Sequence, residues 1–221
     1  MRNLKLIALL ILFLSLTTFN PLENKKNHFQ IFKVNNIIIS GNHLLDQNKI
    51  KNDLSSLVGK NLTFVGNEDL DFVLKNYNLI KRVNIKKIFP NTIKLIIEEK
   101  KLIAIIQNKK KKFYLTEDGI SVNFKEIIKE QKLPVVFGNE KSFLELYKIM
   151  EEINFPVEKI EKYLFFEIGR WDIIFEDKKI IRLPSNNYKL SLENFLNIIS
   201  NNDMKKIMIF DYRIKNQLIL K

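Results

Sequence analysis

Residues 32–59 read FKVNNIIISGNHLLDQNKIKNDLSSLVG, which is the pattern of a strand, a turn and an amphipathic helix. The β-branched run that ends at Ser40 favours a strand, and Gly41 followed by Asn begins a typical turn. Gly59 stands where the end of a helix needs a residue that tolerates positive φ. Between the two glycines, apolar residues recur at helical spacing: Ile50, Leu54, Leu57 and Val58. These residues are therefore predicted to form the buried face of one helix.

A second helix and a hairpin follow along the chain. The helix is predicted to begin near Asn67, with an apolar face made of Leu70, Val73, Leu74 and Tyr77. Two alternating runs then flank a turn at residues 89–91, with Val83 and Ile85 before it and Ile93, Leu95 and Ile97 after it. Two helices over one face of a three-stranded sheet make an α+β module in the order β-α-α-β-β.

This ordered pattern resembles the POTRA domain of the FtsQ/DivIB family of bacterial cell-division proteins. Five short motifs carry the resemblance: Ile39-Ser40-Gly41-Asn42, Gly59-Lys60-Asn61-Leu62, Ile80-Lys81-Arg82-Val83, Phe89-Pro90-Asn91-Thr92-Ile93 and Glu99-Lys100-Lys101-Leu102-Ile103-Ala104. Where the family commonly has Arg and Pro in the last motif, this chain has Lys100 and Leu102. The resemblance implies a POTRA fold for residues 32–101.

Residues 102–221 are predicted to form a mixed β-sheet domain with flanking helices. Short apolar runs bounded by turn residues indicate strands, and stripes at helical spacing indicate helices near residues 143–150 and 188–200. This half also resembles the family, because Gly169-Arg170-Trp171 opens a strand and Asp211-Tyr212-Arg213 precedes the last one. Trp171 and the aromatic residues near it are predicted to belong to the core rather than to a ligand site.

The N-terminal residues 1–22 are predicted to be a short cytoplasmic stub followed by an apolar segment that anchors the chain in a membrane. A helix from Leu4 to Leu22 would span about 28 Å, which is close to the roughly 30 Å thickness of the hydrocarbon core. A cleaved signal peptide is the alternative, although no A-x-A-like cleavage site follows the apolar run. Arg2 and Lys5 favour a cytoplasmic N-terminus. The predicted anchor residues are Leu6, Leu9, Leu10, Phe13 and Leu16, and residues 23–31 are predicted to be a tether.

Composition and motifs give no indication of an enzyme. The chain has no cysteine and two histidines, His28 and His43, both in segments that read as linker or turn. No catalytic triad, phosphate-binding loop or metal motif is evident, so we expect no catalysis, no cofactor and no small-molecule substrate. The net charge of +12 suggests nucleic acid as a partner, but the lysines are spread over every element without interleaved stacking aromatics. Nucleic-acid binding is therefore not expected.

The C-terminal run Ile214 to Leu220 is predicted to be an edge strand that binds a partner. An exposed edge offers unpaired backbone N–H and C=O groups to which a partner adds a strand. The candidate contact residues are Ile214, Asn216, Gln217, Leu218, Ile219 and Leu220, and a proline at Leu218 or Ile219 should abolish binding. Asp211, Tyr212 and Arg213 form a turn that is expected to fix the strand's direction. The alternative is that these leucines only close the core and the edge is covered.

The resemblance implies a single-span scaffold of the bacterial inner membrane whose periplasmic domains hold division proteins similar to FtsB and FtsL at the septum. The POTRA module has a sheet edge and a groove beside its second helix, which are a candidate second contact for other division proteins. A component of outer-membrane assembly or secretion is the alternative, since POTRA domains occur there too. That alternative is disfavoured because the chain shows no array of repeats and too few alternating segments for a barrel.

Overall fold

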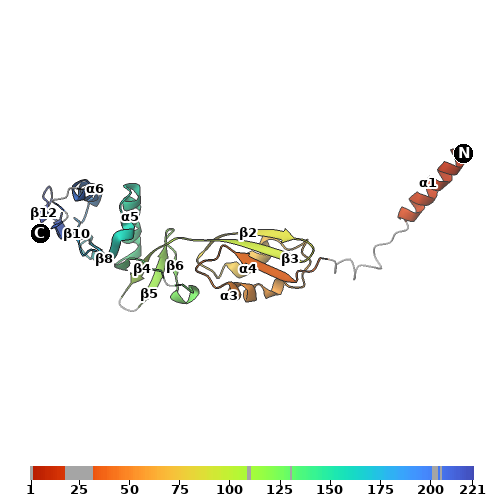
Figure 1. Ribbon diagram of the computed structural model, residues 1–221, viewed down its shortest axis with the longest axis horizontal. Helices are drawn as coiled ribbons and strands as arrows, with labels where there is room; N and C mark the ends of the chain where they lie inside the picture. Colours follow the sequence, from red (N-terminus) through yellow and green to blue (C-terminus); the bar gives the residue numbers. More distant parts are fainter. Residues whose placement is uncertain (1, 18–31, 109–110, 130, 201–203, 205) are drawn as a thin grey trace. The chain divides into compact units, whose positions relative to one another are not determined.

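The computed structural model describes residues 2–17, 32–108, 111–129, 131–200, 204 and 206–221 (Figure 1). The chain divides into two compact units. Residues 1–40, 48–74 and 83–96 form the first unit, and residues 41–47, 75–82 and 97–221 form the second. The architecture is a mixture of helices with one small and one large mixed β-sheet, in agreement with the α+β class predicted from the sequence.

The N-terminal helix α1 (Arg2–Thr17) contains the predicted anchor residues. The side chains of Leu9, Leu10 and Phe13 are exposed, whereas those of Leu6 and Leu16 lie outside the described residues, as does the predicted tether at 23–31. Helix α1 has 16 residues. Within the described ranges, no helix has both the length and the apolar character that crossing a membrane requires.

The β-α-α-β-β pattern predicts three strands, and the structure arranges them in one sheet with the order β1-β3-β2. Strand β1 pairs in parallel with β3, from Asn36 opposite Thr92 to Ser40 opposite Ile96. Buried residues alternate with exposed ones along both strands, and α3 and α4 lie beside the sheet in Figure 1. The bounds are β1 (Asn36–Ser40), α3 (Gln47–Asp53), α4 (Asn67–Leu74), β2 (Ile80–Ile88) and β3 (Thr92–Glu99).

The first predicted helix is shorter than its apolar pattern suggested. Helix α3 ends at Asp53, and a separate 3₁₀ turn covers Ser55–Leu57. Ile50, Leu54 and Leu57 are buried as predicted, but Val58 is 52% exposed, so its place in the buried stripe was wrong. Val58 lies after the 3₁₀ turn in extended backbone, and it therefore no longer follows the helical repeat.

The nine-stranded sheet has the order β12-β11-β10-β9-β8-β7-β4-β5-β6. Its pairings are mixed: β4 with β7, β7 with β8 and β10 with β11 are parallel, and the others are antiparallel. The bounds are β4 (Leu102–Gln107), β5 (Lys112–Thr116), β6 (Ser121–Val122), β7 (Val135–Phe137), α5 (Glu140–Glu152), β8 (Ile160–Phe166), β9 (Arg170–Phe175), β10 (Ile180–Arg182), α6 (Tyr188–Ile199), β11 (Ile209–Asp211) and β12 (Ile219–Leu220).

Helices α5 and α6 share one hydrophobic core with the sheet. Phe143 of α5 and Phe195 of α6 belong to the same buried cluster as Trp171 of β9. Trp171 is 1% exposed, which confirms its predicted place in the core. Because side chains alternate along a strand, Asp172 is directed to the opposite face of the sheet. The helices therefore cover the Trp171 face, and the polar residues of β9 lie on the other.

Candidate functional site

Strand β12 is the edge of the nine-stranded sheet next to the C-terminus. It pairs with β11, with Phe210 opposite Leu220 and Asp211 opposite Ile219. Within the part of the chain that the structure describes, no strand pairs with its other side. An edge of this kind presents backbone groups that a partner strand can use.

The edge strand is shorter than predicted, because only Ile219 and Leu220 of the run that begins at Ile214 are extended. Asn216 has a φ of 61°, and the Gln217 N–H donates to the Ile214 carbonyl at 3.1 Å. A residue in this left-handed conformation turns the chain and cannot continue a strand. The predicted strand over 214–220 was therefore wrong, and three of the candidate residues lie in a turn: Ile214, Asn216 and Gln217.

The three remaining candidates alternate about the sheet. Leu218 and Leu220 are partly buried against the core, whereas Ile219 is 38% exposed on the other face. Lys221 and Ile209 exchange backbone hydrogen bonds of 3.1 and 2.9 Å. Since hydrogen-bonded and non-bonded residues alternate in an antiparallel ladder, Leu220 directs its N–H and C=O toward the open edge. At this edge, the Leu220 side chain therefore packs on the core while its backbone N–H and C=O point away from β11.

The turn before β12 is held from two sides. Tyr212 donates its hydroxyl to the Asn194 side chain of α6 at 3.0 Å, and its N–H donates to the Arg182 carbonyl at 2.9 Å. Asp211 is 3% exposed, and its carboxylate accepts from Arg213 Nε at 2.7 Å and from Arg213 Nη2. Asp211 and Arg213 therefore pair with each other across the turn.

A row of charged side chains crosses the face of the sheet that the helices leave uncovered. Asp172 of β9, Arg182 of β10 and Asp211 of β11 are opposite one another in the strand register. Arg182 contacts both carboxylates at 3.6 Å, and Arg170 contacts Asp172 at 3.4 Å. Sequence analysis did not single out Arg182 or Asp172. The only available signal was the alternation of β9, because strand pairing alone brings these residues together.

The two carboxylates of this row are shifted in opposite directions. The hydrogen bonds from Arg213 lower the pKa of Asp211, against the effect of burial. Burial raises the pKa of Asp172, and the nearby arginines only partly offset it. The ionised form of Asp211 therefore stabilises the fold, whereas ionisation of Asp172 lowers the stability of the fold.

Replacing Asp211 by Asn is expected to lower the free energy of unfolding near pH 7 by about 2 kcal/mol, because a charge-assisted pair is lost at a buried site. A lowered pKa contributes stability above the ordinary carboxyl pKa and loses it as the pH falls. The deficit of Asp211→Asn should therefore shrink below about pH 4. Urea denaturation followed by Trp171 fluorescence measures this difference, and Asp172→Asn is the matched control with the smaller loss. Equal losses in the two variants at pH 7 would contradict the assignment.

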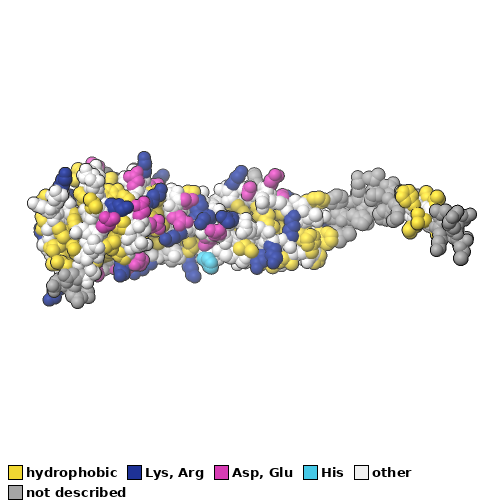
Figure 2. All heavy atoms as spheres, turned by 90° about the horizontal axis from the view of Figure 1, so that it is seen from above, with side chains coloured by type: hydrophobic (Ala, Val, Ile, Leu, Met, Phe, Trp, Pro, Cys, Tyr) yellow, Lys and Arg dark blue, Asp and Glu magenta, His cyan; other side chains and the backbone are white. Residues whose placement is uncertain are grey.

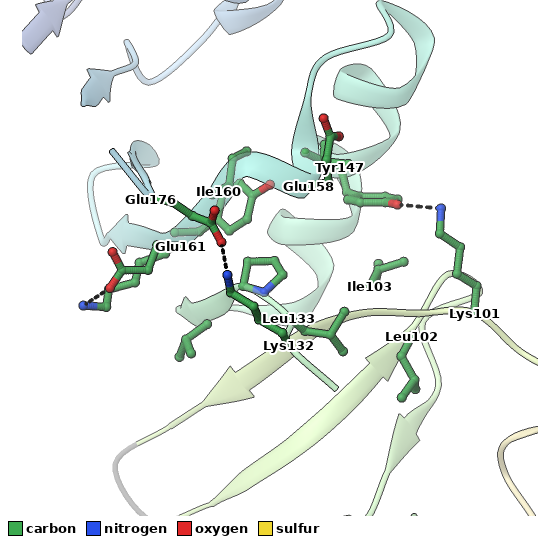
Figure 3. Close-up of a pocket in the computed structure, with 15 residues that line it drawn as sticks. Lys101, Leu102, Ile103, Lys132, Leu133, Tyr147, Glu158, Ile160, Glu161 and Glu176 are labelled. Carbon is green, nitrogen blue, oxygen red and sulfur yellow. Dashed lines mark hydrogen bonds and ion pairs between the residues drawn. The ribbon is translucent and has the colours of Figure 1, made fainter. Parts of the chain in front are cut away.

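A cavity of about 620 Å³ lies elsewhere in the second unit, between the start of β4 and β8 (Figure 3). Two lysines on its rim are already paired: Lys132 lies 2.7 Å from Glu176, and Lys101 donates to the Tyr147 hydroxyl at 3.4 Å. Burial raises the pKa of Tyr147, which leaves it a neutral phenol at physiological pH. The cavity therefore offers apolar walls and a rim on which these two lysines are already paired.

The described residues form no site for metal binding or for histidine chemistry. Among these residues, no group of three His, Asp or Glu side chains is placed to hold a metal ion. His43 is exposed in a bend, and His28 lies outside the described residues. The C-terminal edge is consequently the feature of the second unit that best fits a binding role.

Comparisons with known proteins match both halves of the chain. The model of the FtsQ-type POTRA domain matches residues 32–100, and the model of the C-terminal region of cell division protein FtsQ/DivIB matches residues 104–213. Cell division protein FtsQ of Rickettsia bellii is 26% identical over 197 residues, covering 86% of this chain and 72% of the relative. Cell division protein DivIB of Listeria monocytogenes is 23% identical over 198 residues, covering 87% and 64%.

Among solved structures, the major extracytoplasmic domain of the cell-division protein DivIB from Geobacillus stearothermophilus is similar over 48% of this chain and 96% of that one, with 16% identity and a TM-score of 0.35. The family models and named relatives carry the assignment. An FtsQ-type POTRA domain followed by an FtsQ/DivIB C-terminal region defines a cell-division protein. The chain belongs to the FtsQ/DivIB family. The family match does not favour the alternative of outer-membrane assembly.

Proposed function

We propose that this protein is a non-enzymatic scaffold of the cell-division complex that binds its partners by strand addition at β12. The single observation that supports the proposal is the open edge, where Leu220 directs its backbone N–H and C=O away from β11. A partner strand would satisfy these groups, and the side chains beside the edge would select among partner strands. Partners resembling FtsB and FtsL are proposed because the family resemblance implies them.

The proposal includes attachment to the inner membrane by the N-terminal apolar segment, with the two units on the periplasmic side. Support comes from the apolar run from Leu6 to Leu14 and from the cations Arg2 and Lys5 before it. The proposed domain boundaries are those predicted above: an anchor at 1–22, a tether at 23–31, a POTRA domain at 32–101 and a β domain at 102–221. The proposed place of action is the division septum.

The test compares Leu220→Pro with Leu220→Ala in the full chain. Both variants remove the leucine side chain, but only proline also removes the outward N–H, and a proline is tolerated where that N–H faces solvent. Leu220→Pro is expected to weaken partner binding on the order of tenfold relative to Leu220→Ala, the worth of one buried hydrogen bond. Co-purification of division proteins resembling FtsB and FtsL from solubilised membranes is the measurement.

Two readings decide the outcome. Unchanged Trp171 fluorescence in Leu220→Pro shows that the β domain remains folded, since this is the chain's single tryptophan and it is buried. Equal retention of partners by the proline and alanine variants would exclude strand addition at this edge. Absence of such partners from the wild-type preparation would remove the scaffold proposal itself.

A further inference from the structure

One end of the three-stranded unit carries a group of exposed apolar side chains. Strands β1 and β3 begin at this end, and β2 ends there. Val58 is 52% exposed and Phe89 is 55% exposed, and two further residues add to the surface: Phe64 and Ile88. A cluster of this kind on a small unit indicates contact with an apolar phase or a partner.

Three chain segments form this surface, which we call the lysine-aromatic end: residues 32–36, 58–64 and 86–91. The Leu62 N–H donates to the Phe32 carbonyl at 2.7 Å, and Phe32 contacts Phe89 edge to face with ring centroids 5.2 Å apart. Lys87 Nζ donates to the Thr63 carbonyl at 2.7 Å. These contacts join the segments into one continuous surface of the first unit.

The three segments of the lysine-aromatic end carry only positive charge. Its segments contain four lysines and no acidic residue: Lys33, Lys60, Lys86 and Lys87. The Asp69 carboxylate, just outside, pairs with Lys60 at 2.7 Å and leaves the other three lysines to set the local field. In Figure 2, hydrophobic side chains and Lys or Arg side chains are both exposed at this end of the unit. Apolar side chains ringed by cations are the chemistry that anionic lipid surfaces attract.

We infer that the lysine-aromatic end docks on the anionic surface of the bilayer to which the chain is attached, with its aromatic residues at headgroup level and its lysines against lipid phosphates. The inference rests on the proposed membrane attachment. Phe32 enters the unit at this end and follows α1 after 14 residues, which reach at most about 50 Å. The membrane is thus within reach of this end, and docking would fix the orientation of the unit above it.

Site-specific labelling tests the inference, because the natural chain has no cysteine and one introduced thiol gives one label. Val58→Cys places a fluorophore in the lysine-aromatic end. Ile96→Cys is the matched control, since Ile96 is also apolar and is 42% exposed but lies in the far half of β3. The full chain is reconstituted in phosphatidylglycerol vesicles that carry a nitroxide quencher at headgroup depth. Quenching is expected at position 58 and not at position 96.

Charge substitutions test the electrostatic part of the same contact. Lys33→Gln and Lys86→Gln should each lower the ratio of docked to undocked unit about fivefold, the effect of one cation near an anionic surface. Added salt should weaken quenching at position 58 for the same reason.

A third label, Leu10→Cys in α1, is read in vesicles that carry the nitroxide on the lipid acyl chain, and it separates failure of the inference from failure of the proposed attachment. Quenching at position 10 with no excess at position 58 over position 96 would overturn lipid docking and leave the anchor in place. Absence of quenching at position 10 would overturn the attachment and the docking with it. Crosslinking of position 58 to a second copy of the chain without lipid quenching would overturn docking in favour of a protein contact.

Discussion

Trp171→Ala is expected to lower the free energy of unfolding of the nine-stranded unit by about 3–5 kcal/mol, the usual cost of removing a large buried aromatic side chain. Trp171 is 1% exposed and contacts the rings of Phe143 and Phe165, with centroids 6.3 and 4.8 Å away. The cavity left behind would lie between α5 and the centre of the sheet. Loss of this size is a large fraction of the stability of an ordinary domain.

The measurement is urea denaturation followed by far-ultraviolet circular dichroism, because the variant has no tryptophan to report fluorescence. Ile168→Ala is the matched control: it removes an apolar side chain from the turn before β9, but Ile168 is 70% exposed. Its effect should stay within about 0.5 kcal/mol. Similar losses in the two variants would show that the aromatic cluster does not carry the stability of the unit.

The Trp171 cluster also shows what the sequence can predict. Alternation of apolar and polar residues along β9 and helical spacing along α5 placed Trp171 and Phe143 in the core, because both patterns are local. Asp172 and Arg182 are ten residues apart, and their contact depends on the pairing of β9 with β10. The register of that pairing cannot be predicted from the sequence of either strand alone. The charged row on the uncovered face therefore emerged only from the structure.

Two predictions were wrong, the burial of Val58 and the strand over residues 214–220, because the backbone at each place departs from the local pattern. The apolar spacing that included Val58 continued past the helix, since a 3₁₀ turn changed the repeat before that residue. The run Ile214 to Leu220 has strand composition, but Asn216 adopts positive φ, which asparagine tolerates better than most residues. Partner binding at the surviving edge remains a prediction. It now depends on Leu220, whose outward backbone the sequence could not reveal.

The second large effect is expected at the turn after β1. Gly41→Ala should lower the unfolding free energy by about 2–5 kcal/mol, the sum of left-handed backbone strain and steric overlap. Gly41 has a φ of 83°, and an added Cβ would lie 2.2 Å from the Ile97 carbonyl oxygen of β3. Ile97 directly follows the last residue that β3 pairs with β1, and its backbone oxygen cannot rotate away as a side chain does, so the ends of β1 and β3 would have to separate.

Gly59→Ala is the matched control, because Gly59 has nearly the same φ, 86°, but an added Cβ meets nothing within 4 Å. It should cost only the strain, about 1 kcal/mol. Hydrogen exchange of the β1 and β3 amides in the full chain measures both variants at the sheet concerned. A larger loss of protection in Gly41→Ala shows that the close approach to Ile97 requires glycine at position 41. Equal losses would mean that each glycine is needed only because it adopts positive φ. In the sequence, Gly41 and Gly59 both stand at the end of a predicted element and look alike. Only the packing around them shows that Gly59 permits a turn, whereas Gly41 is required by the neighbouring strand β3.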